Sequence, residues 1–148
     1  MKQLLFLILL ISASYGVQAQ SENASLQAAR KAIEASNDVY SDLANKNDGS
    51  ILTCYTADAC LYPPNAAPVC GRDNMAKFFK NGPKVNSRFI IQHLYGDGQT
   101  YVTEESYYEM TDPQGHKIDD GKVIVIWKKT ADGWKMYRDM FSSNHPAK

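Results

Sequence analysis

Apolar residues near the start of the chain recur every three or four positions. They are Leu26, Ala29, Ile33, Tyr40 and Leu43, and Ser36 falls in the same register. This spacing places side chains on one face of a helix. It predicts an amphipathic helix that Ser21 or Ser25 caps and that ends at residues 47–49, where the sequence Asn-Asp-Gly favours a helix stop.

Two shorter helices are expected further along, over residues 50–56 and 74–80. A brief strand, residues 59–62, lies between them and is followed by a proline-rich tip and by Val69-Cys70. Prolines lack the backbone donor that a sheet needs, so the tip is not expected to be a strand. Gly82 and Pro83 stop the later helix.

The remainder of the chain has the alternation and composition of β-strands. Four strands are predicted, over residues 87–95, 100–110, 122–130 and 134–142. Tight turns at 96–98 and 131–133 separate two pairs of them. Helices followed by a long antiparallel meander indicate an α+β protein in which helices pack on one face of a curved sheet.

The last predicted hairpin has two mostly apolar faces. Pairing about Ala131-Asp132 places one set of side chains together: Ile124, Ile126, Tyr137, Asp139 and Phe141. The opposite face then carries Val123, Val125, Trp127, Met136, Arg138 and Met140. Because an antiparallel sheet usually has one wet face, we expect one face to meet the helices and the other to meet a second subunit.

The first residues are typical of a secretory signal peptide. Lys2 precedes the apolar run 4–13, and Val17-Gln18-Ala19 has the small-x-small pattern of a signal-peptide cleavage site. The run is too short to span a bilayer, although an uncleaved anchor is an alternative. We expect a signal peptide at 1–19 and one domain at 20–148, which is secreted, or periplasmic in a bacterium, and leaves the membrane after cleavage. Asn23 begins a glycosylation sequon, relevant only in a eukaryote.

Charge and cysteine content narrow the classes of partner. Sixteen basic residues balance sixteen acidic ones, so no electrostatic footprint for nucleic acid is present. Three cysteines allow at most one intramolecular disulfide. Neither the cysteines nor His93, His116 and His145 have the spacing of metal ligands, and no glycine-rich phosphate loop occurs. We therefore expect no metal and no cofactor.

Four stretches carry a family resemblance. They are YTADACLYPPN (55–65), CGRDNM (70–75), GKVIVIWK (121–128) and DGWKMYRDMFSSN (132–144). With the helix-first order, they resemble the nuclear-transport-factor-2-like, or ketosteroid-isomerase-like, superfamily, in its polyketide-cyclase-like (SnoaL-like) and kinase-association-domain-like branch. The resemblance implies a cone-shaped half-barrel of three N-terminal helices packed on a curved antiparallel sheet. It also implies an apolar pocket for a small hydrophobic molecule, and homodimers formed through the sheet.

In this fold the segment around the proline tip runs as a short hairpin. Cys60 and Cys70 are equidistant from Asn65, so a symmetric hairpin places them opposite each other. Cross-strand Cβ atoms lie about 4.5–5.5 Å apart, close enough for a disulfide after slight adjustment. A Cys60–Cys70 bond is the leading prediction, and pairing of Cys54 with either cysteine, or no disulfide, remains open.

Asp139 is the sharpest candidate for chemistry. It interrupts an apolar strand, so its carboxyl must be paired, hydrogen-bonded or protonated. In cyclase-like and isomerase-like relatives, an acidic group in the cone transfers a proton at a carbon next to a carbonyl, which suggests Asp139 as acid or base. The alternative is a structural carboxylate bonded to Arg138, Arg72 or a helix end.

His93 is the second catalytic candidate. A symmetric turn places it opposite Tyr101, with Glu105 and Tyr107 on the same face, where such groups could polarise a carbonyl. The alternative is a solvated strand face.

The remaining candidates are residues expected to line the pocket. They are Tyr40, Tyr55, Asp58, Tyr62, Tyr107, Ile124, Ile126, Tyr137 and Phe141. Three functions stay open: a binder of a small, mostly apolar molecule, an isomerase, cyclase or hydratase that uses Asp139, and a non-catalytic association domain.

Overall fold

The computed structural model describes residues 24–146, so the expected signal peptide and the Asn23 sequon lie outside the described residues. The elements in chain order are α1 (Ala24–Lys46), the 3-10 helix η1 (Ser50–Cys54), β1 (Tyr55–Tyr62), β2 (Val69–Cys70), α2 (Arg72–Asn81), β3 (Asn86–Gly96), β4 (Tyr101–Thr111), β5 (Lys117–Thr130) and β6 (Gly133–Ser143). Within this part of the chain, no helix is long and apolar enough to cross a membrane.

The first helix follows the apolar spacing of the sequence. Leu26, Ala29 and Ile33 are buried on one side of α1. The helix ends at Asn47, whose left-handed backbone (φ 51°) is a common helix stop. The second expected helix is only the short η1, so residues 24–146 contain two α-helices rather than three. These residues sit between a helix stop and a strand, which leaves room for little more than one turn.

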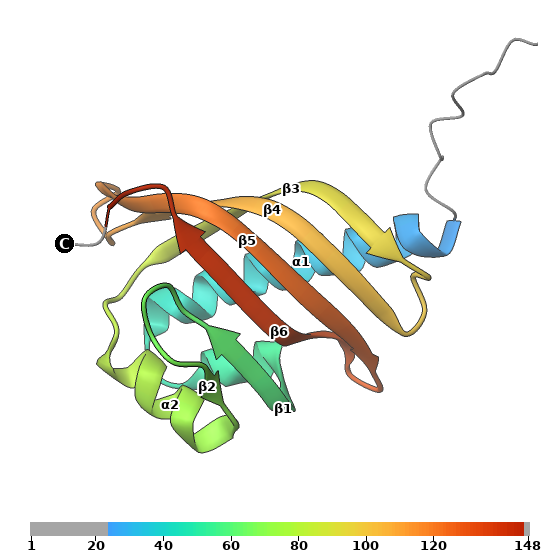
Figure 1. Ribbon diagram of the computed structural model, residues 1–148, viewed down its shortest axis with the longest axis horizontal. Coiled ribbons are helices and arrows are strands. Elements are labelled where there is room, and N and C mark those ends of the chain that lie inside the picture. The colour runs from blue at the N-terminus through green and yellow to red at the C-terminus, as the bar shows by residue number, and fades with distance from the viewer. Residues whose placement is uncertain (1–23, 147–148) are drawn as a thin grey trace, which may run out of the picture.

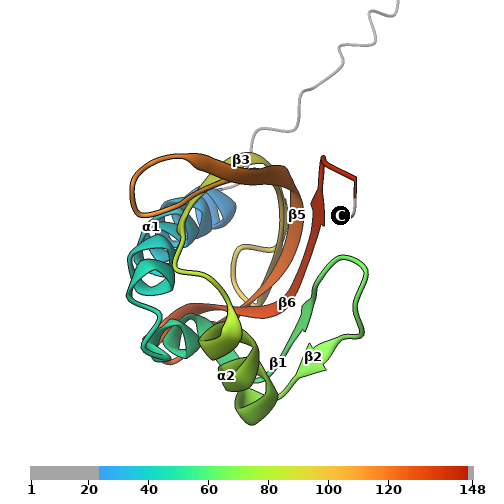
Figure 2. The ribbon, with the colours of Figure 1, turned by 90° about the vertical axis from the view of Figure 1, so that its left-hand side faces the viewer.

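The strands form one curved sheet in the order β2-β1-β6-β5-β4-β3. The sheet is mixed rather than antiparallel, because β1 pairs in parallel with β6. Figures 1 and 2 show the sheet curling into a half-barrel, with α1 beside β3 and α2 beside β1. The architecture is thus the expected α+β cone.

A bulge in β6 corrects the predicted faces of the last hairpin. Ile126 pairs with Arg138, whereas the next residue, Trp127, pairs with Met136. Tyr137 is therefore an extra residue, and a bulge reverses which face the following side chains occupy. The inner face carries the buried side chains Val123, Val125, Trp127, Trp134, Met136 and Asp139.

The outer face is left with Ile124 and Met140, which are 51% and 54% exposed. The prediction that Asp139 shares a face with Ile124 and Tyr137 is wrong. The symmetric pairing assumed for this hairpin did not include the extra residue.

A fully buried glutamate joins α1 to the centre of the sheet. Glu104 on β4 accepts hydrogen bonds from Trp127 Nε1 at 2.7 Å, from Ser106 Oγ at 2.5 Å and from Asn37 Nδ2 at 3.2 Å. Burial raises the pKa of Glu104, and these hydrogen bonds oppose that shift. A buried carboxylate is tolerated only when its oxygens are satisfied in this way.

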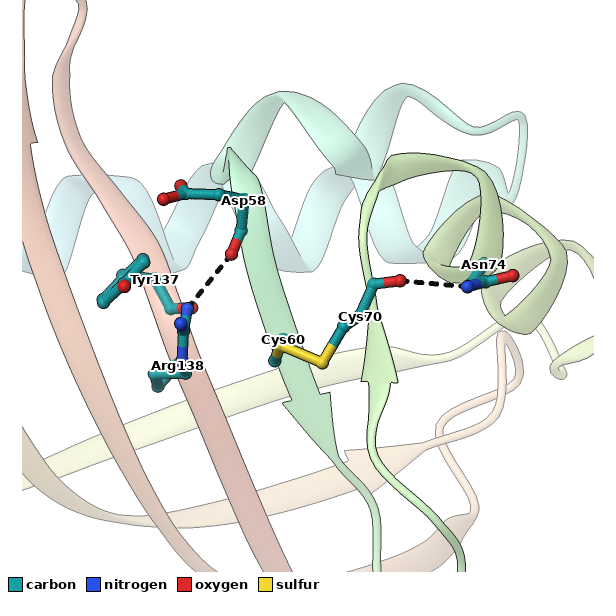
Figure 3. The surroundings of a disulfide bond; sticks show 6 residues. All are labelled: Asp58, Cys60, Cys70, Asn74, Tyr137 and Arg138. Carbon is teal, nitrogen blue, oxygen red and sulfur yellow. Dashed lines mark hydrogen bonds between the residues drawn. A yellow bond between two sulfur atoms is a disulfide. The ribbon is translucent and has the colours of Figure 1, made fainter.

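The proline-rich segment is a disulfide-linked hairpin, as the leading prediction had it. Cys60 and Cys70 are direct partners on β1 and β2 and are bonded to each other, and Cys54 is a buried free thiol. Asn74 Nδ2 donates to the Cys70 carbonyl at 3.0 Å, which ties the first turn of α2 to the hairpin (Figure 3). The hairpin therefore fixes the start of α2.

We expect Glu104→Gln to lower the free energy of unfolding by about 1–3 kcal/mol, because an amide nitrogen would then face buried N–H and O–H donors. Glu105→Gln is the matched control, since Glu105 is exposed and bonded to Tyr95 at the surface. Its effect should stay within about 0.5 kcal/mol. Urea unfolding followed by tryptophan fluorescence measures both, and equal effects would contradict the assigned role of Glu104.

Candidate functional site

A cavity of about 250 Å³ opens at the end of the cone where α1, α2 and the sheet meet. Most of its lining is aliphatic or aromatic. The lining residues are Tyr40, Leu43, Ala44, Asn47, Ile51, Leu61, Phe78, Phe79, Gly82, Pro83, Val85, Ser87, Phe89, Tyr108, Met110, Val123, Asp139 and Phe141. A small number of polar groups in an apolar hollow is the usual composition of a small-molecule site.

Asp139 brings the only charged side chain among these lining residues into the cavity. Tyr55 donates a hydrogen bond to its Oδ2 at 2.7 Å. Burial raises the pKa of Asp139 to about 6, the Tyr55 hydrogen bond opposes this shift, and the negative charge of Glu104 adds to it. A carboxyl with this pKa changes charge close to neutral pH.

Arg138 does not neutralise this carboxyl, although it is the next residue in the chain. Its Nη1 donates to the carbonyl oxygens of Asp58 and Tyr137, and its guanidinium lies 3.6 Å from the centre of the Tyr137 ring. Figure 3 shows Arg138 directed toward Asp58 on the neighbouring strand. The predicted alternative of an Asp139–Arg138 ion pair is therefore wrong, because consecutive strand residues point to opposite faces.

Four aromatic rings, those of Tyr40, Tyr55, Phe79 and Phe89, form a connected cluster at the cavity. The ring centres of Tyr40 and Phe89 lie 5.3 Å apart, those of Tyr40 and Tyr55 lie 6.2 Å apart, and those of Tyr55 and Phe79 lie 5.7 Å apart. Burial and the nearby Asp139 charge raise the pKa of both tyrosines above 10. Both hydroxyls are thus neutral at physiological pH.

Tyr108 forms part of the opposite wall and is held from outside. Its hydroxyl donates to Asp119 Oδ2 at 2.8 Å. A side chain at Gly121 would place its Cβ 2.7 Å from this ring and 2.0 Å from the Ser142 carbonyl oxygen. Glycine is therefore required at this position for the ring to lie against β5.

The structure brings some of the predicted site residues together and separates others. Tyr40, Asp139 and Phe141 line the cavity, and Tyr55 is buried beside Asp139. The other predicted pocket residues do not line it: Asp58, Tyr62, Tyr107, Ile124, Ile126 and Tyr137. Tyr107 and Ile124 are about half exposed, at 50% and 51%, which places them outside the core.

His93 is exposed and lies away from the cavity lining. It pairs with Glu105 rather than with Tyr101, because the connection between β3 and β4 spans residues 97–100 and Gly96 pairs with Val102, which moves the centre of the turn beyond the predicted one. Its ring contacts Tyr95 at the surface, with centres 6.0 Å apart. His93 is therefore not placed to act with Asp139 on a molecule in the cavity.

Sequence reasoning missed several walls of the site. Phe78 and Phe79 on α2, Val85 just before β3 and Phe89 on β3 were not singled out. Their apolar character is visible in the sequence. The packing of α2 over the end of the sheet belongs to the tertiary structure, however, and no local sequence pattern predicts it. Across residues 24–146, no group of three or more His, Cys, Asp or Glu side chains could hold a metal ion.

Sequence comparison with models of protein families and with curated proteins gives no match. Solved structures do match. An NTF2-like protein with a cystatin-like fold from Novosphingobium aromaticivorans is 14% identical, with a TM-score of 0.69 over 82% of this chain and 86% of that one.

Two further structures have the same architecture. A ketosteroid isomerase-like protein from Erwinia carotovora atroseptica is 21% identical, with a TM-score of 0.60 over 86% of this chain and 99% of that one. A protein from Catenulispora acidiphila, solved in complex with S-DNPA, is 16% identical, with a TM-score of 0.63 over 80% and 95% of the two chains. The protein therefore shares the α+β fold of these NTF2-like and ketosteroid isomerase-like structures.

Proposed function

We propose that the protein binds a small, mostly apolar molecule in the cavity at the end of the cone. The observation that carries this proposal is the cavity itself, an apolar hollow of about 250 Å³ with a carboxyl in its wall. A cavity of about 150 Å³ is enough to hold benzene, so the ligand is a single ring or a short branched chain rather than a steroid-sized molecule. An association domain without a ligand would have no need of such a hollow.

One protein of this fold, from Catenulispora acidiphila, has been solved in complex with S-DNPA. That observation concerns the other protein, whose sequence differs at most positions. It supports a binding role here because the same cone shape provides the hollow.

The proposal includes export of the mature chain from residue 20 onward, to the outside of the cell or to a periplasm. The basic start and short apolar run of the sequence support it, and so does the Cys60–Cys70 disulfide, because such bonds persist in oxidising compartments.

It also includes a homodimer formed through the outer face of the sheet. Large apolar side chains on that face are left uncovered in one chain: Tyr101, Tyr107, Ile124 and Met140 are 41–54% exposed. Exposed apolar side chains that share one face of a sheet favour an association surface there, because large exposed apolar areas are typical of such surfaces.

A second candidate function is acid–base catalysis. The observation that favours it is the buried Asp139 carboxyl with a pKa of about 6 beside the Tyr55 hydroxyl. The ionised carboxyl would remove a proton from a carbon next to a ligand carbonyl, which breaks the C–H bond and forms an enolate. The same carboxylic acid would return the proton, and the Tyr40 hydroxyl lies in the same cavity as a donor for the enolate oxygen.

A blocked cavity tests the binding function. Ala44 lines the cavity, so Ala44→Phe should fill it and weaken the binding of benzyl alcohol at least about tenfold, as seen by calorimetry or ligand-observed NMR. Ala35 lies on the exposed side of the same helix, and Ala35→Phe is the matched control. No binding by the unmodified protein, or equal binding by both variants, would contradict the proposal.

Deuterium exchange tests the catalytic candidate. The unmodified protein should speed the exchange of the hydrogens next to the carbonyl of cyclohexanone in D₂O, and Asp139→Asn should remove this acceleration, as NMR would show. An acceleration that survives the substitution would exclude Asp139 as the base.

The same variant should be folded and more stable at alkaline pH, which serves as its control. A folded-state pKa above the ordinary value of 3.8 means that the folded protein binds the Asp139 proton more tightly than the unfolded chain. The free energy of unfolding therefore falls as pH rises from about 4 to about 6. Since the amide that replaces the carboxyl has no charge to bury, Asp139→Asn should exceed the original protein by about 1–3 kcal/mol at pH 8, and this difference should disappear near pH 4.

The dimer is tested by placing a charge on the outer face. Ile124→Lys should convert a dimer into a monomer in sedimentation or native mass measurements, because two lysines would meet an apolar interface. Val39→Lys is a control, since Val39 is a similarly exposed residue (51%) on α1 rather than on the sheet. A chain that is monomeric before any substitution would overturn the proposed interface.

A further inference from the structure

The charges around the cavity are unbalanced. Among the lining residues, Asp139 is the single acid, and no Lys, Arg or His is present. The other polar groups in the lining belong to neutral side chains: Tyr40, Asn47, Ser87 and Tyr108. A molecule that enters this hollow therefore meets one negative charge and no positive one.

The Asp139 carboxylate is also incompletely satisfied. Within residues 24–146, Tyr55 is the one side chain that donates to it, through Oδ2. The groups that act on it electrostatically or by hydrogen bonding come from β1 and β4: the neutral Tyr55 and the negative Glu104. From α1, Tyr40 faces the same carboxylate and is also neutral. A buried carboxylate without a cation is unfavourable, and a cationic ligand would relieve it.

The aromatic rings of the cavity also favour a cationic ligand. Tyr40, Phe79 and Phe89 line the cavity, and Tyr40 packs edge-on against both Tyr55 and Phe89. Aromatic faces attract organic cations, and the Tyr40 oxygen is an additional acceptor for a donor on the ligand. Hydrocarbon around such a cation would be covered by the aliphatic walls.

We propose that the cavity selects a small apolar amine in its protonated form, with the ammonium paired to Asp139 and the hydrocarbon against the aromatic and aliphatic walls. This inference rests on the proposed binding function and names its ligand class. An anion of the same shape would bring a like charge to Asp139, and a neutral alcohol would leave the carboxylate without a counter-ion.

The proposal fixes the sign of the pH dependence. An alkyl ammonium stays protonated to about pH 10, so the group that changes charge in the working range is Asp139, whose pKa of about 6 implies an ionised form at pH 8. Amine affinity should therefore be highest near pH 8 and fall as pH drops below 6. A neutral ligand that accepts a hydrogen bond from the protonated Asp139 carboxyl would show the opposite trend.

Three probes of one shape test the inference on the mature protein: benzylamine, benzyl alcohol and benzoate. At pH 8 we expect the affinity for benzylamine to be at least about tenfold higher than that for benzyl alcohol. Benzoate should bind more weakly than both. The advantage of the amine should shrink at pH 5. Asp139→Asn should remove the advantage of benzylamine over benzyl alcohol at pH 8.

The outcomes separate the two proposals. If benzyl alcohol binds and Ala44→Phe blocks it, but benzylamine gains nothing at pH 8, the amine inference fails and the binding function stands. If none of the three probes binds, both fail. The pH profile of the unmodified protein decides the inference even where the Asp139 variant does not fold, because a rise in amine affinity at acid pH overturns it.

Discussion

The arrangement of the cone depends on the hydrogen bonds that Glu104 accepts inside it. Its partners come from α1, from β4 itself and from β5, namely Asn37, Ser106 and Trp127. Hydrophobic burial alone would allow α1 to slide or rotate on the sheet, because apolar contacts are not directional. A buried carboxylate must keep its donors, so it sets where the helix lies and hence where the second half of α1 forms the cavity wall.

Much of the fold could be predicted because it follows from local periodicity. The three-four spacing of Leu26, Ala29 and Ile33 gives α1, and the alternation after residue 86 gives the four long strands. The parallel pairing of β1 with β6 joins strands far apart in the sequence, and no local pattern specifies it. The sequence order of elements therefore predicted the class of fold but not the mixed sheet.

The site was less predictable, for reasons that particular residues illustrate. Asp139 stood out because a carboxylate in an apolar strand needs a partner, yet the bulge at Tyr137 defeated the assignment of its neighbours. Glu104 had a signal that was overlooked: alternation places it with the apolar Val102 and Tyr108, whereas Glu105 alternates with the solvent face. The cavity itself arises from how α2 docks, which depends on contacts between distant segments.

The two ends of α2 are held very differently. At its start, the disulfide and the bond from the Gly71 amide to the Ala59 carbonyl join it to β1, and the Asn74 side chain joins it to β2. Near its end, the Asn47 side chain donates to the Gly82 carbonyl at 3.2 Å. Phe78 and Phe79 lie near this end and line the cavity. The covalent link therefore lies beside the end of α2 that does not line the cavity, and the end that forms the cavity wall is held by packing and hydrogen bonds alone.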